Sequence, residues 1–348
     1  MHIYVNKKSK ADAPKKIDFA VGGQAVIEGV MMRSPNGYTI SVRAANGKIK
    51  MKQKDFTSAT ERVTIFGVKP LGWPLLRGVV HLVESMIIGI SGLNFSNSVF
   101  LDEDFDESKK EERSAMMKVL WGIFGFFYML GTLGFTLFLL KFLPLWVAEK
   151  AAELWPVVAD YYILFNAIDG LTKIAIFLAY ILGISLLKDI RRVFQYHGAE
   201  HKSIWVYESG LPLTVPNARK QTRFHPRCGT SFIFFVILMS VLIYTLVPPA
   251  DDFWMKLGQR LMVLPVIAGV SYETLKLTAK FSDGKKCDGG KCFAAGSAFM
   301  KLMVAPGLLL QRLTTLEPDD EQLEVALHSL EAALKYERRK KKSSGKKS

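Results

Sequence analysis

The residues with the clearest capacity for chemistry lie in a polar stretch, Asp189 to Ser231, between two apolar segments. Within it, His197, Glu200 and His201 form an H-x-x-E-H pattern. If this stretch is helical, the two histidines lie one turn apart on the same face, with the glutamate beside them. Two imidazoles at that spacing can bind one Zn²⁺, and a neighbouring carboxylate can accept a proton from metal-bound water. We therefore predict His197 and His201 as metal ligands and Glu200 as a general base.

Two further candidate ligands, His225 and Cys228, follow about one loop later. Either of them, added to the two helical histidines, would leave the open position that a catalytic zinc needs. All four residues together would close the coordination shell and make the site structural. A third interpretation needs no metal, because the helical histidines could hydrogen-bond to backbone or carboxylate groups near a membrane surface. The spacing leaves these three alternatives open.

Other candidate ligands have weaker support. A peptidase with this motif would take its third ligand from a distant carboxylate, and Glu273 or Glu317 could serve, but neither belongs to an obvious ligand motif. Cys287 and Cys292 are separated by four residues, so we expect no zinc knuckle there. A total of three cysteines favours reduced thiols in a cytosolic setting over a disulfide framework. The sequence contains no Ser-His-Asp arrangement, P-loop or dinucleotide-binding fingerprint, which argues against those enzyme classes.

The composition is typical of a membrane protein with a substantial polar part. Hydrophobic residues make up 49% of the 348 residues and the mean hydropathy is +0.17, whereas 22% of the residues are charged. The net charge of +14 lies partly at the C-terminus, where eight of the residues from Lys335 to Ser348 are lysine or arginine. We expect such a tail to be disordered and to bind anionic lipid or nucleic acid.

The elements that must position the candidate ligands begin with a small N-terminal antiparallel β-meander, predicted within a cytosolic segment, residues 1–62. Alternating residues and the turn signals Pro35-Asn36-Gly37 and Asn46-Gly47 predict three strands between Phe19 and Lys54. Residues 63–118 are predicted to contain an interfacial or protein-packed helix and an acidic linker. Three ionisable groups in that helix argue against a passage through lipid.

About four transmembrane helices are predicted, which makes the fold a mainly α membrane protein. Residues 119–187 hold the first two spans, residues 188–229 form a cytosolic loop with the candidate ligands, and residues 230–277 hold the other two. Residues 278–316 are predicted to be re-entrant or interfacial, and residues 317–348 to form a cytosolic amphipathic helix with the basic tail. The predicted spans are Val119–Leu140, Ile163–Leu187, Thr230–Val247 and Leu257–Leu277.

Charge in the loops predicts the orientation. The loop between the second and third spans contains eight lysine and arginine residues. The loop between the first and second spans and the loop between the third and fourth spans contain two each. By the positive-inside rule, the basic loop lies in the cytoplasm. We therefore predict a multi-pass protein of the cell membrane, with both termini and the histidine-bearing loop on the cytoplasmic side.

Several blocks of the sequence resemble one known family. The blocks GGQAVIEGVMMRSP, DIRRVFQYHGAEHKSIWVYESG, TRFHPRCGTSF and LTTLEPDDEQLEVAL are similar to those of the YqhQ-like family, which comprises uncharacterised and mostly bacterial polytopic membrane proteins. The resemblance extends from about Phe19 to about Leu334, and the segment Gly284 to Cys292 departs from it. The family carries the label "predicted metal-dependent enzyme". The resemblance therefore implies the same candidate site: His197, Glu200, His201, His225 and Cys228.

Three functional hypotheses follow. The preferred one is a non-enzymatic docking or biogenesis factor, because a membrane anchor, a β-platform and a cationic tail suit a ribosome, a translocon or an anionic membrane as partner. The second is a membrane-bound metal-dependent enzyme, such as a zinc hydrolase at the cytoplasmic face. The third is a transporter, which rests on Asp169, Lys173 and Glu273 within the predicted spans. The sequence leaves a homo-oligomer open.

Overall fold

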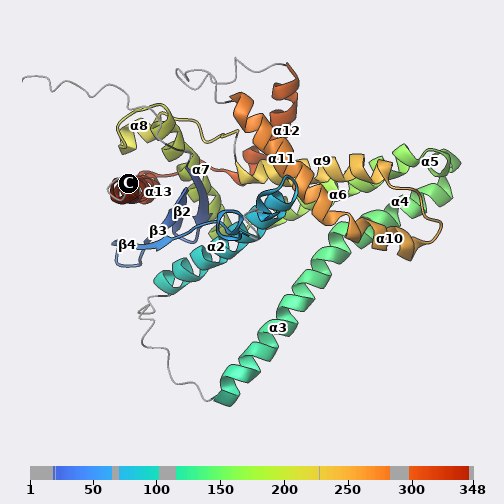
Figure 1. Cartoon of the computed structure of the whole chain (residues 1–348), viewed down its shortest axis with the longest axis horizontal. Helices are drawn as coiled ribbons and strands as arrows, with labels where there is room; N and C mark the ends of the chain where they lie inside the picture. The colour runs from blue at the N-terminus through green and yellow to red at the C-terminus, as the bar shows by residue number, and fades with distance from the viewer. Residues whose placement is uncertain are drawn as a thin grey trace, which may run out of the picture.

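The computed structural model describes residues 19, 21–64, 70–101, 115–226, 228–282 and 298–344. Helices dominate these residues, as the sequence predicts, and a small sheet near the N-terminus lies at one end of the molecule (Figure 1). Helices α4 (Leu143–Leu154), α5 (Pro156–Asp160) and α10 (Phe253–Met262) lie at the opposite end. The two ends are therefore built from different kinds of structure, and they are connected by apolar helices.

The sheet is antiparallel, and its four strands follow one another in sequence order, where the sequence predicts three strands. The extra turn is formed by Ile27 and Glu28, neither of which is usual in a two-residue hairpin loop. Glu28 adopts a positive φ of 50°, and its carboxylate is held by Arg192. The predicted turns at Asn36 and Gly47 are confirmed. The strands are β1 (Gly22–Val26), β2 (Gly29–Ser34), β3 (Gly37–Arg43) and β4 (Ile49–Asp55).

Both faces of the sheet are covered by helices. Helices α7 (Lys188–Glu208) and α13 (Asp320–Ser344) pack on one face, and α2 (Leu76–Phe100) packs on the other. Because neighbouring residues of a strand point to opposite faces, the Thr39 hydroxyl bonds to Ser329 on α13 while Ile40 packs with Phe95 on α2. The predicted apolar stripe on the C-terminal helix is buried in this core: Leu323, Leu327, Leu330 and Leu334.

Within the described residues, three helices are long and apolar enough to cross a membrane, and a fourth span is added if a bent pair counts as one. Two of them correspond to the first two predicted spans: α3 (Ala115–Leu137), which continues into α4, and α6 (Tyr162–Ile184). The bent pair, α10 and α11 (Leu264–Ser282), corresponds to the fourth predicted span and breaks by 43°. The third predicted span is α9 (Gly229–Leu246), whose apolar portion is shorter.

Helix α2 is the third of the long apolar helices, although the sequence predicts that this region is interfacial or packed on protein. One side of α2 does pack on protein, because the buried carboxylate of Glu84 accepts hydrogen bonds from Ser58 and from the backbone N–H of Ala59. Its opposite side exposes large apolar side chains such as Met86 and Ile87. Length and composition thus give three or four candidate spans for the described residues.

The C-terminal part is helical where the sequence predicts disorder. The basic tail is predicted to be disordered, but α13 continues through Lys340 to Ser344. This part of the helix is anchored to the sheet, because Lys340 lies 3.2 Å from the carboxylate of Asp55 and the Tyr336 hydroxyl donates to the same carboxylate. In the predicted re-entrant segment, α12 (Ala298–Thr314) is a helix with Pro306 inside it. Cys287 and Cys292 lie outside the described residues.

We expect Leu330→Ala to lower the free energy of unfolding by about 2–5 kcal/mol, because it leaves a cavity in a close-packed core. The side chain of Leu330 is fully buried between α13 and the sheet. Leu309→Ala on α12 is the matched control, since that side chain is 61% exposed. Thermal unfolding in detergent measures both, and equal melting temperatures for the two variants would contradict the packing described here.

Candidate metal centre

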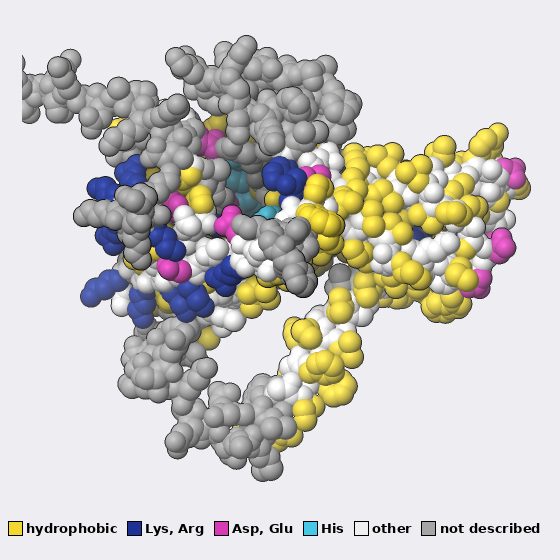
Figure 2. All heavy atoms as spheres, viewed as in Figure 1, with side chains coloured by type: hydrophobic (Ala, Val, Ile, Leu, Met, Phe, Trp, Pro, Cys, Tyr) yellow, Lys and Arg dark blue, Asp and Glu magenta, His cyan; other side chains and the backbone are white. Residues whose placement is uncertain are grey.

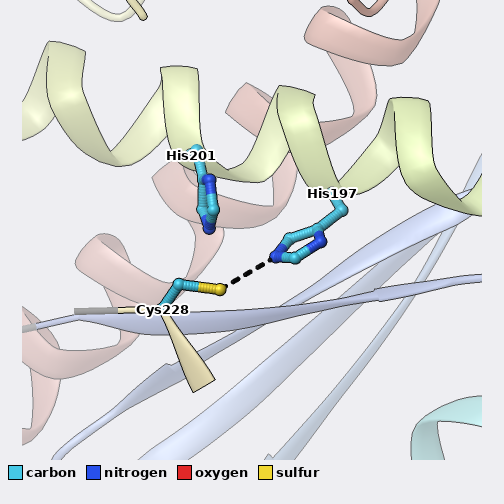
Figure 3. Close-up of side chains that lie close together, drawn as sticks. All are labelled: His197, His201 and Cys228. Atoms are coloured by element: carbon cyan, nitrogen blue, oxygen red, sulfur yellow. Dashed lines mark hydrogen bonds between the residues drawn. The ribbon is translucent and has the colours of Figure 1, made fainter. Parts of the chain in front are cut away.

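Helix α7 and the start of α9 bring three potential ligand atoms together. His197 and His201 lie one turn apart on α7, as the sequence predicts, and Cys228 is the N-cap residue of α9. The side chains point towards one another (Figure 3). One ligand atom from each residue lies within 4.8 Å of the other two. Such a group is compact enough to hold one metal ion.

Hydrogen bonds to the main chain set the orientation of both imidazoles. The Nδ1 atom of His197 lies 2.9 Å from the carbonyl oxygen of Thr314, and Nδ1 of His201 lies 2.5 Å from that of Arg223. A carbonyl oxygen can only accept, so Nδ1 carries the proton and, in the neutral ring, Nε2 carries the lone pair. Metal-binding histidines commonly have this arrangement, in which the second nitrogen donates to a carbonyl or carboxylate.

The two Nε2 atoms face the cysteine but differ in their hydrogen-bond partners. Nε2 of His197 lies 3.2 Å from Sγ of Cys228. Nε2 of His201 is buried and has no hydrogen-bond partner among the described residues. Burial lowers the pKa of His201, although the neighbouring Cys228 opposes this change, and the neutral ring is the form that can ligate a metal. An unsatisfied lone pair is costly in a buried site, and a metal ion would satisfy it.

Cys228 is held in place by capping contacts. Its Sγ caps the first turn of α9, where it lies 3.4 Å from the backbone N–H of Thr230 and 3.1 Å from the hydroxyl of that residue. Arg227, the residue before Cys228, lies outside the described residues.

Glu200 lies beside the three ligands. Its carboxylate is 3.9 Å from Nε2 of His197 and 5% of the residue is exposed. Burial raises the pKa of Glu200, while the imidazoles of His197 and His225 and the backbone N–H of Gly23 oppose that change. A Cβ atom on Gly23 would stand 2.6 Å from Cγ of Glu200. Only glycine, which has no Cβ atom, allows β1 to lie this close to the Glu200 side chain. The sheet thus covers the centre.

His225 lies next to the centre, outside the group of three. Its ring centroid is 5.7 Å from that of His201 and 4.9 Å from that of Trp205. Its Nε2 atom is 3.4 Å from the carboxylate of Glu208, which lies on the last turn of α7. The structure therefore brings together His197, His201 and Cys228 of the predicted ligands, with His225 paired to a carboxylate.

Two residues that sequence reasoning missed hold the ligands in place. The side-chain amide of Gln311 on α12 both donates to the carbonyl and accepts from the N–H of His225, each at 2.8 Å. This buried amide fixes the loop that leads to Cys228. Gly198 allows a close approach, because a Cβ atom there would stand 2.1 Å from the carbonyl oxygen of Leu316. The chain that carries the Thr314 carbonyl can therefore lie against α7.

Comparison with known proteins assigns no activity to this site. Residues 73–336 match the family described as "Protein of unknown function (DUF1385)". The chain is 36% identical over 330 residues to the "Uncharacterized protein YqhQ" of Bacillus subtilis (strain 168), and the alignment covers 92% of this chain and 94% of that protein. No solved structure matches. The resemblance to YqhQ-like proteins is confirmed.

We expect Gly198→Ala to lower the free energy of unfolding by about 1–3 kcal/mol, because the new methyl group meets a main-chain carbonyl that cannot rotate away. Gly183→Ala on α6 is the control, since a Cβ atom there meets nothing within 4 Å. Thermal unfolding in detergent compares the two variants with the unchanged protein. A Gly198→Ala protein as stable as the Gly183→Ala protein would contradict the close approach of the segment after α12.

Proposed function

The chain belongs to the DUF1385, or YqhQ-like, family, which has no established function, and we propose from its residues that it is a membrane-associated zinc-dependent hydrolase. The proposed ligands are His197, His201 and Cys228, and the proposed general base is Glu200. One observation carries this proposal: the buried Nε2 atom of His201 has no partner among the described residues and faces the other two ligand atoms.

The donor set supports zinc over a hard cation. Two neutral imidazoles and one thiolate are borderline to soft ligands, which Zn²⁺ prefers and which Mg²⁺ or Ca²⁺ would not select. The hydrogen bonds from both Nδ1 atoms to carbonyl oxygens supply the outer support that such ligands usually have. The same features argue against the alternative in which the histidines serve only as hydrogen-bonding groups, because that role leaves Nε2 of His201 unsatisfied.

Three protein ligands favour a catalytic over a structural centre. A structural zinc site is closed by four protein ligands, whereas a catalytic one keeps a position for water. His225 is the fourth ligand that could close this site, but its Nε2 atom lies beside the carboxylate of Glu208. A zinc ion bound here would lower the pKa of a water molecule at the fourth position.

Glu200 provides the proton acceptor in this proposal. Its carboxylate lies next to Nε2 of His197, so it also lies close to any ion that this nitrogen binds. The N–H of Gly23 holds the carboxylate in place. Glu200 would accept a proton from the attacking water and donate it to the leaving group, which is the usual role of such a carboxylate. The positive-inside pattern of the loops supports a cytoplasmic position for this chemistry.

We expect the purified protein to carry about one equivalent of zinc, and His201→Ala or Cys228→Ser to lose most of it. Glu200→Gln should retain the metal, because the proposal places this residue outside the ligand set. Elemental analysis of protein purified without added metal measures these contents. With Co²⁺ in place of zinc, the thiolate charge-transfer band should be present and should be absent from Cys228→Ser.

The open position has its own test. Added imidazole should change the visible spectrum of the Co²⁺ protein, because it can enter a free coordination site. An unresponsive spectrum, or a Glu200→Gln protein that loses the metal as fully as His201→Ala, would indicate a closed structural centre. A metal-free protein of unchanged stability would remove the proposal.

A second function, docking of an anionic partner, is favoured by one observation. The end of α13 is held against the end of β4 by the contacts of Lys340 and Tyr336 with Asp55. Both ends carry cations, and Figure 2 shows dark-blue side chains gathered at this end of the molecule. Lys54, Arg338, Arg339, Lys340 and Lys342 are together called the basic patch. It suits a ribosome, a translocon or an anionic lipid surface.

We expect the triple substitution of Arg338, Arg339 and Lys342 by Gln to weaken binding to anionic partners, and more so at low salt. Sedimentation with ribosomes and with vesicles of phosphatidylglycerol forms two separate arms, which distinguish the partners. The control removes equal charge elsewhere, by substituting Lys188, Arg191 and Lys220, which are all exposed. Equal loss in both triple variants, or no loss in either, would contradict a role for the basic patch.

A further inference from the structure

A second group of charged side chains lies inside the helical bundle, near the opposite end of α9 from Cys228 of the metal centre. Three cations surround the ring of Tyr244 on α9. Lys141 lies 5.5 Å from the ring centroid, Lys173 lies 4.9 Å from it, and the guanidinium of Arg260 lies 4.8 Å from it. They come from three different elements, namely the π-helical stretch Phe138–Phe142, α6 and α10. The fold therefore concentrates positive charge at one point.

The carboxylates of this cation cluster do not balance its charge. Asp169 pairs with Lys173 and lies 2.5 Å from NH1 of Arg260. Lys256, the next cation on α10, pairs with Glu149 at 2.6 Å. Among the described residues, the cations of the cluster are Lys141, Lys173, Lys256 and Arg260, and the carboxylates are Asp169 and Glu149. The cations therefore exceed the carboxylates by two charges.

Burial makes this imbalance costly. Asp169 is fully buried, and Lys173 and Arg260 are 3% and 4% exposed. A charge inside an apolar bundle needs a partner of opposite sign or a strong acceptor. The neutral groups present are weak substitutes: the Asn166 oxygen accepts from Arg260 at 2.9 Å, and the Tyr244 hydroxyl accepts from Lys141 at 3.0 Å. The surplus positive charge calls for a further anion.

A small pocket, with room for about one water molecule, lies beside the cluster. Its lining residues include two tyrosines, Gln259, Lys256 and Arg260, all with polar side chains. The Tyr244 hydroxyl donates to the carbonyl oxygen of Arg260, but the other side chains carry N–H or O–H groups that suit an acceptor with negative charge at the mouth of the pocket. The lining residues are Tyr162, Tyr244, Val247, Lys256, Gln259 and Arg260.

The ends of α6 and α9 indicate the level of this pocket in the membrane. Tyr162 begins α6, and Val247 follows directly after the last residue of α9, so both apolar helices end at the pocket. Trp155 and Trp254, near the same end, are 58% and 67% exposed. Exposed tryptophans at helix ends are typical of the boundary between hydrocarbon and headgroups. The phosphate groups of phospholipids lie at that level.

We propose that the mouth of this pocket binds the phosphate group of a phospholipid headgroup, in the leaflet at the end of the bundle opposite the sheet (Figure 1). Lys256 and Arg260 would contact the phosphate oxygens directly, and Lys141 and Lys173 would supply the surplus charge behind them. A bound headgroup would neutralise the cluster and hold α6, α9 and α10 at a fixed depth. This site is independent of the metal centre, which lies at the other end of α6 and α9.

Lys141→Met is the informative variant. Lys141 contacts Tyr244 and does not pair with Asp169, so its removal keeps the ion pairs of Asp169 and lowers the surplus charge by one. Lys150→Met is the control, because Lys150 is exposed and pairs with Glu153 at 2.7 Å. Each protein is washed extensively in detergent and extracted. Phosphorus is then measured in the organic fraction, which holds phospholipid, and in the aqueous fraction, which holds inorganic phosphate.

We expect organic phosphorus in the unchanged protein and in Lys150→Met, and about tenfold weaker retention in Lys141→Met. A second measurement does not depend on copurification. Added dihexanoyl-phosphatidylglycerol should raise the melting temperature of delipidated protein, whereas dihexanoylglycerol, which lacks the phosphate, should not. Lys256→Met, which removes a lining cation, should abolish the rise if Lys141→Met does not fold.

Three outcomes would overturn the proposal. Phosphorus confined to the aqueous fraction would show an adventitious ion only. Equal organic phosphorus in Lys141→Met and in the unchanged protein would show that lipid is held elsewhere. A stable protein without phosphorus and without a thermal response to the phospholipid would show that a neutral lysine relieves the surplus charge.

Discussion

The hydrogen bonds from two histidine Nδ1 atoms to main-chain carbonyls are the constraint on which the candidate centre depends. They hold His197 and His201 so that both Nε2 atoms turn towards Cys228. Each bond requires a specific fold of chain against α7: the end of α12 supplies one carbonyl, and the loop before α9 supplies the other. The glycine between the two histidines is necessary for this arrangement, because only a residue without Cβ lets the segment after α12 lie so close. The geometry of the centre is therefore a property of the whole sheet-bearing end.

That end of the molecule is assembled from segments far apart in the sequence. The sheet reaches the centre through Gly23, α12 reaches it through Gln311, and α13 packs the sheet against α7. Lys202, which is 2% exposed, is paired with Glu317 and adds a further tie between α7 and the C-terminal region. Such a burial of polar groups is stable only when each finds a partner. Among the described residues of the centre, Nε2 of His201 is the exception, and the proposed metal ion would satisfy it.

Local patterns in the sequence predicted the features that depend on local geometry, namely the helical spacing of the candidate residues and two of the turns. Helical spacing placed His197, Glu200 and His201 together, and Asn-Gly signals located two of the turns. The Ile27-Glu28 turn was missed because it has no turn signature, and its positive φ is stabilised by Arg192, which lies far along the chain. The order of α13 beyond Tyr336 was missed for the same reason, since Asp55 anchors it from the sheet. Thr314 and Gln311 could not be predicted as supports, because nothing in a single sequence reveals contacts between distant segments. The domain boundaries and the orientation in the membrane stay predictions.

The two proposed sites follow from one electrostatic argument applied with opposite signs. At the sheet-bearing end, one buried lone pair, that of His201 Nε2, faces two other ligand atoms, so the proposed ligand is a cation. Inside the bundle, the buried cations described above outnumber the carboxylates, so the proposed ligand is an anion. A low dielectric makes either imbalance expensive, and evolution retains such costly groups chiefly where a ligand or a function compensates for them. The sign of the uncompensated buried charge is thus a guide to ligand chemistry in a chain whose relatives offer none. Here it distinguishes the metal site proposed near the sheet, at the start of α9, from the headgroup site proposed near the other end of that helix.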